Sequence, residues 1–173
     1  APKIEIDFKS DGASGQEFIH AHAEFRKRGS ETWEALAAII DYPELHPWIS
    51  DTKLAHQSGE RQQEFIIEFK FPWPLGFRWS RIQVNRESPT KISWHQLEGN
   101  LQANQGQLSF ISRGGQARID YQATVGVGLP DVLTRHYRKK FVLEFLDAVL
   151  DRVAATPSTN GLTLANSSQS IAP

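Results

Sequence analysis

The residues from Asp131 to Ala155 are the longest stretch that favours one helix, and they restrict what the rest of the chain can form. Pro130 precedes the stretch, Asp131 puts a negative charge at its start, and neither proline nor glycine interrupts it. Its apolar side chains recur at spacings of three, four or seven, with His136 as an interruption: Val132, Leu143, Leu146, Leu150 and Val153, widened by Leu133, Tyr137, Phe141, Phe145 and Val149. So wide an apolar face needs a large apolar cover, which the upstream sequence predicts to be a curved sheet.

Composition excludes several classes of function. The 173 residues suffice for one domain with a sizeable core, and 19 basic against 20 acidic residues leave a net charge of −1. Without a basic patch, we expect no nucleic-acid partner. No segment approaches the roughly 20 apolar residues of a membrane-spanning helix, so we expect a soluble protein. The chain has no cysteine, which excludes disulfides, thiolate metal sites and cysteine nucleophiles.

The start of the chain bears on its compartment. The chain contains no methionine and begins with Ala1 and Pro2, as it would after removal of an export signal. We therefore expect an exported or periplasmic protein rather than a cytoplasmic one, although trimming of another kind would leave the same start.

Alternating apolar and polar residues predict a series of strands. From Gln16 to Arg26, Ile19, Ala21, Ala23 and Phe25 share one face, and His20, His22 and Glu24 share the other. Short turns separate six further predicted strands: Asp51 to Ser58, Gln62 to Phe71, Phe77 to Arg86, Lys91 to Glu98, Gln107 to Ser112 and Gln116 to Val127. Each has one apolar and one polar face, which is typical of an antiparallel sheet covered on one side.

Two short helices are expected between the first strand and the other six. Ser30 is a good N-cap for a helix over Thr32 to Asp41 that ends before Pro43, and a helical turn follows from Pro43 to Ile49. The prediction is an α+β fold in which a curved seven-stranded antiparallel sheet wraps around the long C-terminal helix. Residues 1–14 would be an N-terminal extension with at most a short strand, 15–155 the domain, and 156–173 a flexible polar tail. One helix about 10–12 Å wide cannot cover seven strands, so an elongated apolar space should remain.

Three segments carry a resemblance to a known superfamily: TWEALAAIIDYPELHPWI, SWHQLEGNLQANQGQLSF and RIDYQATVGVGLPDVLTRHYRKKFVLEFLDAVLDRV. They resemble the helix-grip superfamily (START-like, pollen-allergen-like, SRPBCC), in particular its bacterial cyclase/dehydrase or coenzyme Q-binding-like branch, over about Gln16 to Ala155. YPELHPWI is similar to a Tyr-Pro-x-(Leu or Phe)-x-Pro-Trp run of the quinone-binding branch. A second pattern matches an uncharacterised bacterial branch: Trp94, Glu98, Gly99, Asn100 and Gly106. The resemblance implies a tunnel between sheet and long helix that holds a hydrophobic small molecule, and no cofactor is expected.

The expected tunnel lining is largely aromatic: Trp48, Phe65, Ile67, Phe69, Phe71, Trp73, Ile92, Trp94, Phe110, Tyr121, Leu133, His136 and Tyr137. The alternative is that the strand residues among them only fill the sheet's inner face. The turn from Pro72 to Phe77 could cover the tunnel mouth, contact a membrane transiently, or pack on the core as a structural aromatic cluster.

Few residues qualify for catalysis. The candidates are Tyr121, His136 and Arg81, but a satisfied core histidine is the preferred explanation of His136, with ligand contact or proton transfer as the alternatives, and alternation turns Arg81 outward. His20, His22 and Glu24 have metal-ligand chemistry, yet their strand face should be solvated, so we expect no metal site.

Three functions fit these observations. The preferred one is a non-catalytic carrier or chaperone for a lipid, quinone, terpenoid or polyketide-like molecule. The first alternative is a polyketide-type aromatase, cyclase or dehydrase that uses a cavity tyrosine, histidine or arginine. The second is a membrane- or partner-binding module whose cavity is too small to matter.

Overall fold

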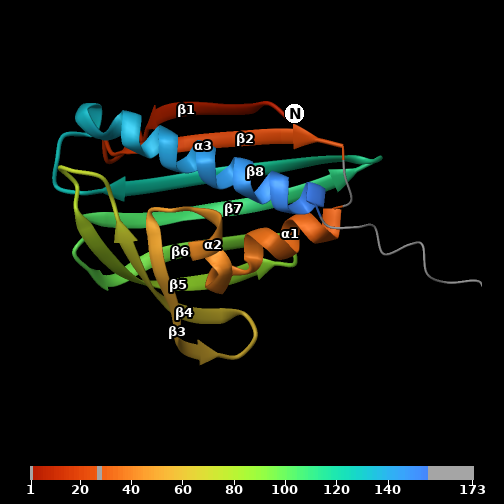
Figure 1. The fold of residues 1–173 in the computed structure, drawn as a ribbon, viewed down its shortest axis with the longest axis horizontal. Helices are drawn as coiled ribbons and strands as arrows, with labels where there is room; N and C mark the ends of the chain where they lie inside the picture. The colour runs from red at the N-terminus through yellow and green to blue at the C-terminus, as the bar shows by residue number, and fades with distance from the viewer. Residues whose placement is uncertain (1, 27–28, 156–173) are drawn as a thin grey trace, which may run out of the picture.

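The structure is a computed structural model that describes residues 2–26 and 29–155. Along the chain lie β1 (Ile4–Ser10), β2 (Glu17–Phe25), α1 (Gly29–Ala37), the 3-10 helix η1 (Ile39–Asp41), α2 (Tyr42–Leu45), β3 (Ile49–Ser58), β4 (Gln62–Lys70), β5 (Phe77–Ser88), β6 (Lys91–Gly99), β7 (Ala103–Arg113), β8 (Gln116–Gly126) and α3 (Asp131–Ala155). The strands form one eight-stranded sheet in the order β1-β2-β8-β7-β6-β5-β4-β3, and every neighbouring pair is antiparallel. The predicted α+β class and the curved sheet around a long helix are confirmed (Figure 1).

The sheet has eight strands rather than the predicted seven. The additional strand is β1, which pairs with β2 from Ile4 opposite Ala23 to Ser10 opposite Glu17. Its apolar residues Ile4, Ile6 and Phe8 are half-buried against the core, so an alternation of only three apolar positions was enough to recruit it. The tail predicted for residues 156–173 lies outside the described residues.

The short helices end earlier than predicted. At Ala38 the backbone leaves the helical region (φ −81°, ψ 68°), so α1 stops at Ala37 and η1 follows. The turn predicted from Pro43 to Ile49 stops at Leu45, because His46, which precedes Pro47, is extended (φ −143°, ψ 129°). The hydroxyl of Tyr42 donates a hydrogen bond to the carbonyl of Leu36 and ties α2 back to α1.

Helix α3 has the predicted bounds but is rotated from the predicted orientation. Val132 and Leu133, expected to face the sheet, are 65% and 63% exposed. Thr134 and Arg138 are buried in their place, because Arg138 reaches across to Glu17 on β2. From Phe145 onward the buried face is apolar as predicted: Phe145, Leu146, Val149, Leu150 and Val153. Val142 is also buried, whereas Leu143, predicted to lie in the apolar stripe, is 36% exposed.

Helix α3 covers only part of the inner face of the sheet. It packs against β1 and β2, where the buried side chains of Ala21 and Ala23 are small. In Figure 1, α3 runs over the β2 and β8 side of the sheet, while α1 and α2 lie toward the other side. The inner faces of β4, β5 and β6 therefore extend beyond α3. None of the described helices combines the length and apolar content needed to cross a lipid bilayer.

Candidate functional site

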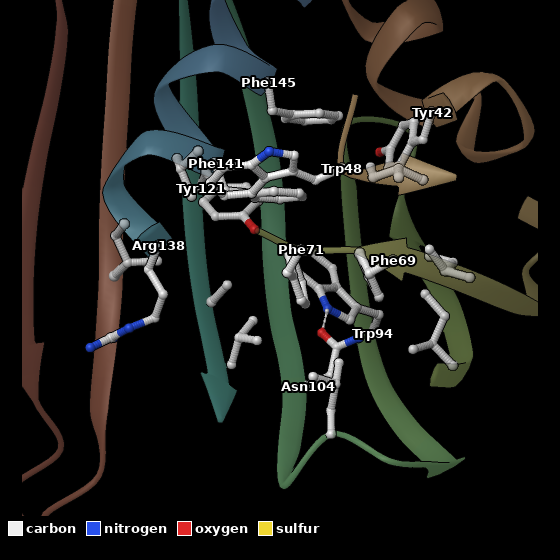
Figure 2. Close-up of a pocket in the computed structure, with 18 of the residues that line it drawn as sticks. Tyr42, Trp48, Phe69, Phe71, Trp94, Asn104, Tyr121, Arg138, Phe141 and Phe145 are labelled. Atoms are coloured by element: carbon white, nitrogen blue, oxygen red, sulfur yellow. Dashed lines mark hydrogen bonds between the residues drawn. The ribbon is translucent and has the colours of Figure 1, made fainter. Parts of the chain in front are cut away.

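An apolar cavity of about 120 Å³ lies between α3 and the inner face of the sheet. One water molecule needs roughly 10–15 Å³, and an apolar cavity of about 150 Å³ admits benzene. The space therefore suits a small organic molecule, and a larger ligand would require its walls to separate. Aliphatic and aromatic side chains form nearly all of these walls. The aromatic ones are Tyr137 and, labelled in Figure 2, Tyr42, Trp48, Phe69, Phe71, Trp94, Tyr121, Phe141 and Phe145.

Trp48 is held at the cavity by His46, whose side chain is fully buried. Nδ1 of His46 accepts a hydrogen bond of 3.0 Å from the backbone N–H of Trp48, and Nε2 lies 3.1 Å from Oε2 of Glu144 on α3. The imidazole also packs on Phe141, with ring centroids 4.5 Å apart. Burial lowers the pKa of His46 and Glu144 opposes this effect. His46 thus fixes the segment that carries Trp48 onto α3.

Trp94 is held against the sheet by a chain of polar side chains. Its Nε1 donates to Oδ1 of Asn104 at 3.1 Å, and Nδ2 of Asn104 donates to Oγ of Ser80 at 3.2 Å. Ser80 donates to Oε1 of Gln96 at 2.6 Å, and Nε2 of Gln96 donates to the carbonyl of Leu101 at 2.9 Å. These bonds join β5, β6 and β7 and fix the indole on the cavity wall.

Gly106 makes room for this indole. A Cβ at Gly106 would lie 2.5 Å from Cζ2 of Trp94 and 2.3 Å from the carbonyl oxygen of Gln122. Gly106 stands directly opposite Trp94 in the β6–β7 register. The Trp94 and Gly106 positions of the sequence pattern are therefore a packing pair.

The Gly99 and Asn100 positions of that pattern join the end of β6 to the start of β5. Oδ1 of Asn100 accepts from the backbone N–H of Trp79 at 2.7 Å, and the N–H of Asn100 donates to the carbonyl of Trp79 at 3.1 Å. A Cβ at Gly99, whose φ is +156°, would lie 2.5 Å from that carbonyl oxygen. This half of the pattern stabilises the connection after β6 and does not line the cavity.

Tyr121 on β8 lies beside Trp94, with ring centroids 5.8 Å apart. It is 8% exposed, and its hydroxyl has no hydrogen-bond partner among the described residues. Burial raises the pKa of Tyr121, so its phenol stays protonated and can donate a hydrogen bond but not act as a base at neutral pH. Figure 2 shows the Tyr121 side chain among the aromatic rings around the cavity.

Charged groups meet at the start of α3, where sequence reasoning did not expect them. Glu17 of β2 accepts hydrogen bonds from Arg135 and from Arg138, the latter at 2.7 Å. The hydrogen bond from Arg135 is the main reason that the pKa of Glu17 falls to about 2, and Arg138 adds to it. Arg138 lines the cavity, while its guanidinium, in Figure 2, points toward β2. One feature of the sequence could have indicated this ion pair: Arg138 is a charged residue at a position that helical spacing places on the buried face of α3.

Comparison with known proteins bears on the fold. No family model matches the chain, and no curated protein matches it in sequence. Solved structures do match. A STAR-related lipid transfer protein from Xanthomonas axonopodis gives a TM-score of 0.72 at 11% identity, with 87% of this chain and 93% of that chain covered. The ZhuI aromatase/cyclase from Streptomyces sp. R1128 gives 0.67 at 13% identity, covering 83% and 97%. A START superfamily protein from Mycobacterium smegmatis gives 0.69 at 11% identity, covering 79% and 97%. The chain has the helix-grip fold.

The helix-grip domain brings most of the predicted ligand-binding side chains to its cavity: Trp48, Ile67, Phe69, Phe71, Ile92, Trp94, Tyr121 and Tyr137. The prediction that five others line it is wrong. Phe65 and Phe110 are buried in the core beyond the cavity, and Phe110 packs on Phe25 instead. Leu133 and His136 face outward because α3 is rotated.

The fifth is Trp73, on the turn between β4 and β5. It is 89% exposed, so packing of its indole on the core is excluded. Leu75, two residues later, is buried and lines the cavity. The turn therefore contributes one side chain to the cavity and presents another to the outside.

Two of the three catalytic candidates do not reach the cavity of the helix-grip domain. Arg81 pairs with Glu64 at 2.6 Å on the outer face, as its alternation predicted, and His136 lies on the exposed side of α3. Only Tyr121 lines the cavity. His20 and His22 face outward near Asp120 and Glu5, and within residues 2–26 and 29–155 no cluster of three metal-binding side chains occurs.

Proposed function

We propose that this protein binds a hydrophobic small molecule in the cavity between the sheet and α3, as a carrier or chaperone rather than as an enzyme. The observation that carries the proposal is the lining: nearly every side chain is aliphatic or aromatic, and Arg138, the charged one among the described lining residues, directs its guanidinium toward Glu17. At roughly 25 cal/mol per Å², burial of a few hundred Å² of ligand would supply several kcal/mol before entropic costs.

The names of two solved structures with a similar fold support this proposal. One is named as a lipid transfer protein and another as an aromatase/cyclase. The first name concerns lipids, and the apolar wall of this cavity has the chemistry to enclose an apolar molecule. Since one fold hosts many functions, the proposal rests on the lining of this chain and not on its neighbours.

The proposal is tested by calorimetric titration with toluene, a neutral apolar molecule of one ring, and by mass spectrometry of molecules that copurify with the protein. We expect saturable binding. Val127→Trp fills space at the cavity wall and should weaken binding, while Val132→Trp, on the exposed side of α3, should not. Binding that is equal in both variants would contradict the proposal.

A cyclase or aromatase function keeps one supporting observation, the unpartnered hydroxyl of Tyr121 on the cavity wall. A single protonated phenol could polarise a ketone, but none of the described residues that line the cavity is a histidine, aspartate or glutamate to serve as the base. An aromatisation assay on a poly-ketone analogue decides this point. Turnover that Tyr121→Phe abolishes, with binding retained, would establish the enzyme.

We also propose a transient membrane contact through the turn from Pro72 to Phe77. Trp73 and Phe77 are 89% and 56% exposed there, and aromatic side chains favour the interface between lipid and water. The turn is joined to the cavity by Leu75, so a docked turn would place the cavity near the lipid.

A further inference from the structure

The chain has three tyrosines, and all of them line the cavity. Their hydroxyl groups are in different situations. Tyr42 donates to the carbonyl of Leu36. Tyr137 is only half-buried, next to the exposed His136, and its hydroxyl has no hydrogen-bond partner among the described residues. Tyr121 is buried, and its hydroxyl is without a partner in the described part of the chain. A hydroxyl that faces an apolar cavity without a protein partner makes no hydrogen bond unless a molecule in the cavity accepts one from it.

Apart from Tyr121, the polar side chains of the cavity wall offer hydrogen-bond donors to a ligand but no carboxylate acceptor. Asn104 uses its oxygen for Trp94 and one amide N–H for Ser80, so a second N–H remains. Thr134 donates to the carbonyl of Asp131 and accepts from Nε of Arg138. No carboxylate is present among the described lining residues. A ligand that satisfies this wall must therefore bring an acceptor.

Two features limit the charge of that acceptor. The guanidinium of Arg138 is already paired with Glu17, although its Nη1 has no partner among the described residues. Elsewhere the wall is apolar, and an anion placed there would lose its hydration without a charged partner. Because burial raises the pKa of Tyr121, the phenol remains a donor throughout the neutral range. A neutral carbonyl fits this environment better than a carboxylate.

We infer that the cavity selects a neutral molecule of one ring, or of two rings when its walls separate, that carries a carbonyl oxygen, with the hydroxyl of Tyr121 as the hydrogen-bond donor to that oxygen. The inference rests on the proposed function and specifies the class of ligand for the same cavity.

Calorimetric titration with three probes of similar size tests the inference: tetralone, tetralin and naphthoate. Tetralone and tetralin share a skeleton and differ by the carbonyl. We expect tetralone to bind about two- to tenfold more tightly than tetralin, as one net hydrogen bond predicts. Naphthoate should bind more weakly than tetralone. The carbonyl stretching frequency of bound tetralone should be lower than in an apolar solvent.

Tyr121→Phe should remove both the preference for tetralone and the frequency shift, while tetralin still binds, which shows that the variant is folded. Tyr42→Phe is the matched control, because its hydroxyl is already bonded to Leu36, and it should keep the preference. Equal binding of tetralone and tetralin to the unmodified protein, or a preference that survives Tyr121→Phe, overturns the inference alone. Tightest binding by naphthoate overturns it in favour of an anion at Arg138. If no probe binds, the proposed function fails as well.

Discussion

Glu17 and Arg138 are 121 positions apart in the chain, and a hydrogen bond of 2.7 Å joins their side chains between β2 and α3. Both side chains are 9% exposed. The aliphatic part of Arg138 lines the cavity, so this ion pair holds α3 over the space in which we propose that the ligand binds. The first two predictions concern this pair.

Arg138→Met keeps an apolar stem along the cavity and removes the guanidinium. Breaking a buried pair leaves an uncompensated charge, which costs about 3–5 kcal/mol. Glu17 retains Arg135, so we expect a loss of about 3 kcal/mol in the free energy of unfolding, measured by urea denaturation. Arg118→Met breaks more exposed pairs with Asp120 and Glu24 and should cost at most about 1 kcal/mol. Similar losses of unfolding free energy in both variants would show that the Glu17–Arg138 pair does not stabilise the contact between β2 and α3.

The same carboxylate predicts a response to acid. The pKa of Glu17 is lowered to about 2 in the folded state from 4.5, so the unfolded state binds more protons between these values. The stabilisation by Glu17 should be complete above pH 4.5 and should disappear as the pH falls toward 2. The difference in unfolding free energy between the unmodified protein and Glu17→Gln should therefore shrink over that interval. A difference that stays constant with pH would refute the linkage.

Local sequence patterns predicted the strands and the bounds of α3, because alternation and helix boundaries depend on neighbouring residues. The inward residues of β4 and β6, such as Ile67, Phe69 and Ile92, follow from alternation alone. The orientation of the first turns of α3 could not be predicted, since it depends on Glu17, whose contact with Arg138 spans 121 positions. Leu133 and His136 were misplaced for that reason.

In the candidate site too, some features follow from local sequence and others depend on contacts between distant residues. Trp94 could be predicted from its strand face, whereas the Asn104 and Ser80 bonds that fix its indole connect three strands. Trp73 was misplaced because a turn has no periodicity from which to predict direction. The unpaired state of the Tyr121 hydroxyl depends on what its neighbours already bind, which no spacing in the sequence encodes.

Burial of His46 predicts a second pH dependence of the unfolding free energy, at a higher pH than that of Glu17. Burial lowers its pKa below 6.5, so the unfolded state takes up a proton first as the pH falls below that value. The stabilisation by neutral His46 is present above pH 6.5 and should decline below it. His46→Asn retains an acceptor for the backbone N–H of Trp48 and should flatten the stability profile below pH 6.5. His136→Asn, on the exposed side of α3, is the control and should leave the His46-dependent decline in place. An unchanged profile in His46→Asn would be inconsistent with this role.

Gly106→Ala tests the packing pair with Trp94. The added Cβ would lie 2.5 Å from the indole and 2.3 Å from the carbonyl oxygen of Gln122, so the indole or the strand has to move. We expect a loss of about 1–3 kcal/mol in unfolding free energy and a changed near-ultraviolet circular dichroism spectrum. Gly12→Ala is the matched control, since nothing lies within 4 Å of a Cβ there. Equal stability of the two variants would mean that Gly106 is not required by the indole.

Trp73→Ala tests the membrane contact. Because the indole is 89% exposed, its removal should leave the thermal unfolding midpoint unchanged. If it inserts into lipid, its loss should weaken cosedimentation with phosphatidylcholine vesicles by about tenfold or more, since burial of a large apolar side chain contributes about 1.5–3 kcal/mol. Leu97→Ala removes another exposed apolar side chain, from β6, and should have little effect on vesicle binding. Equal vesicle binding by the unmodified protein and both variants would exclude the turn as the membrane contact.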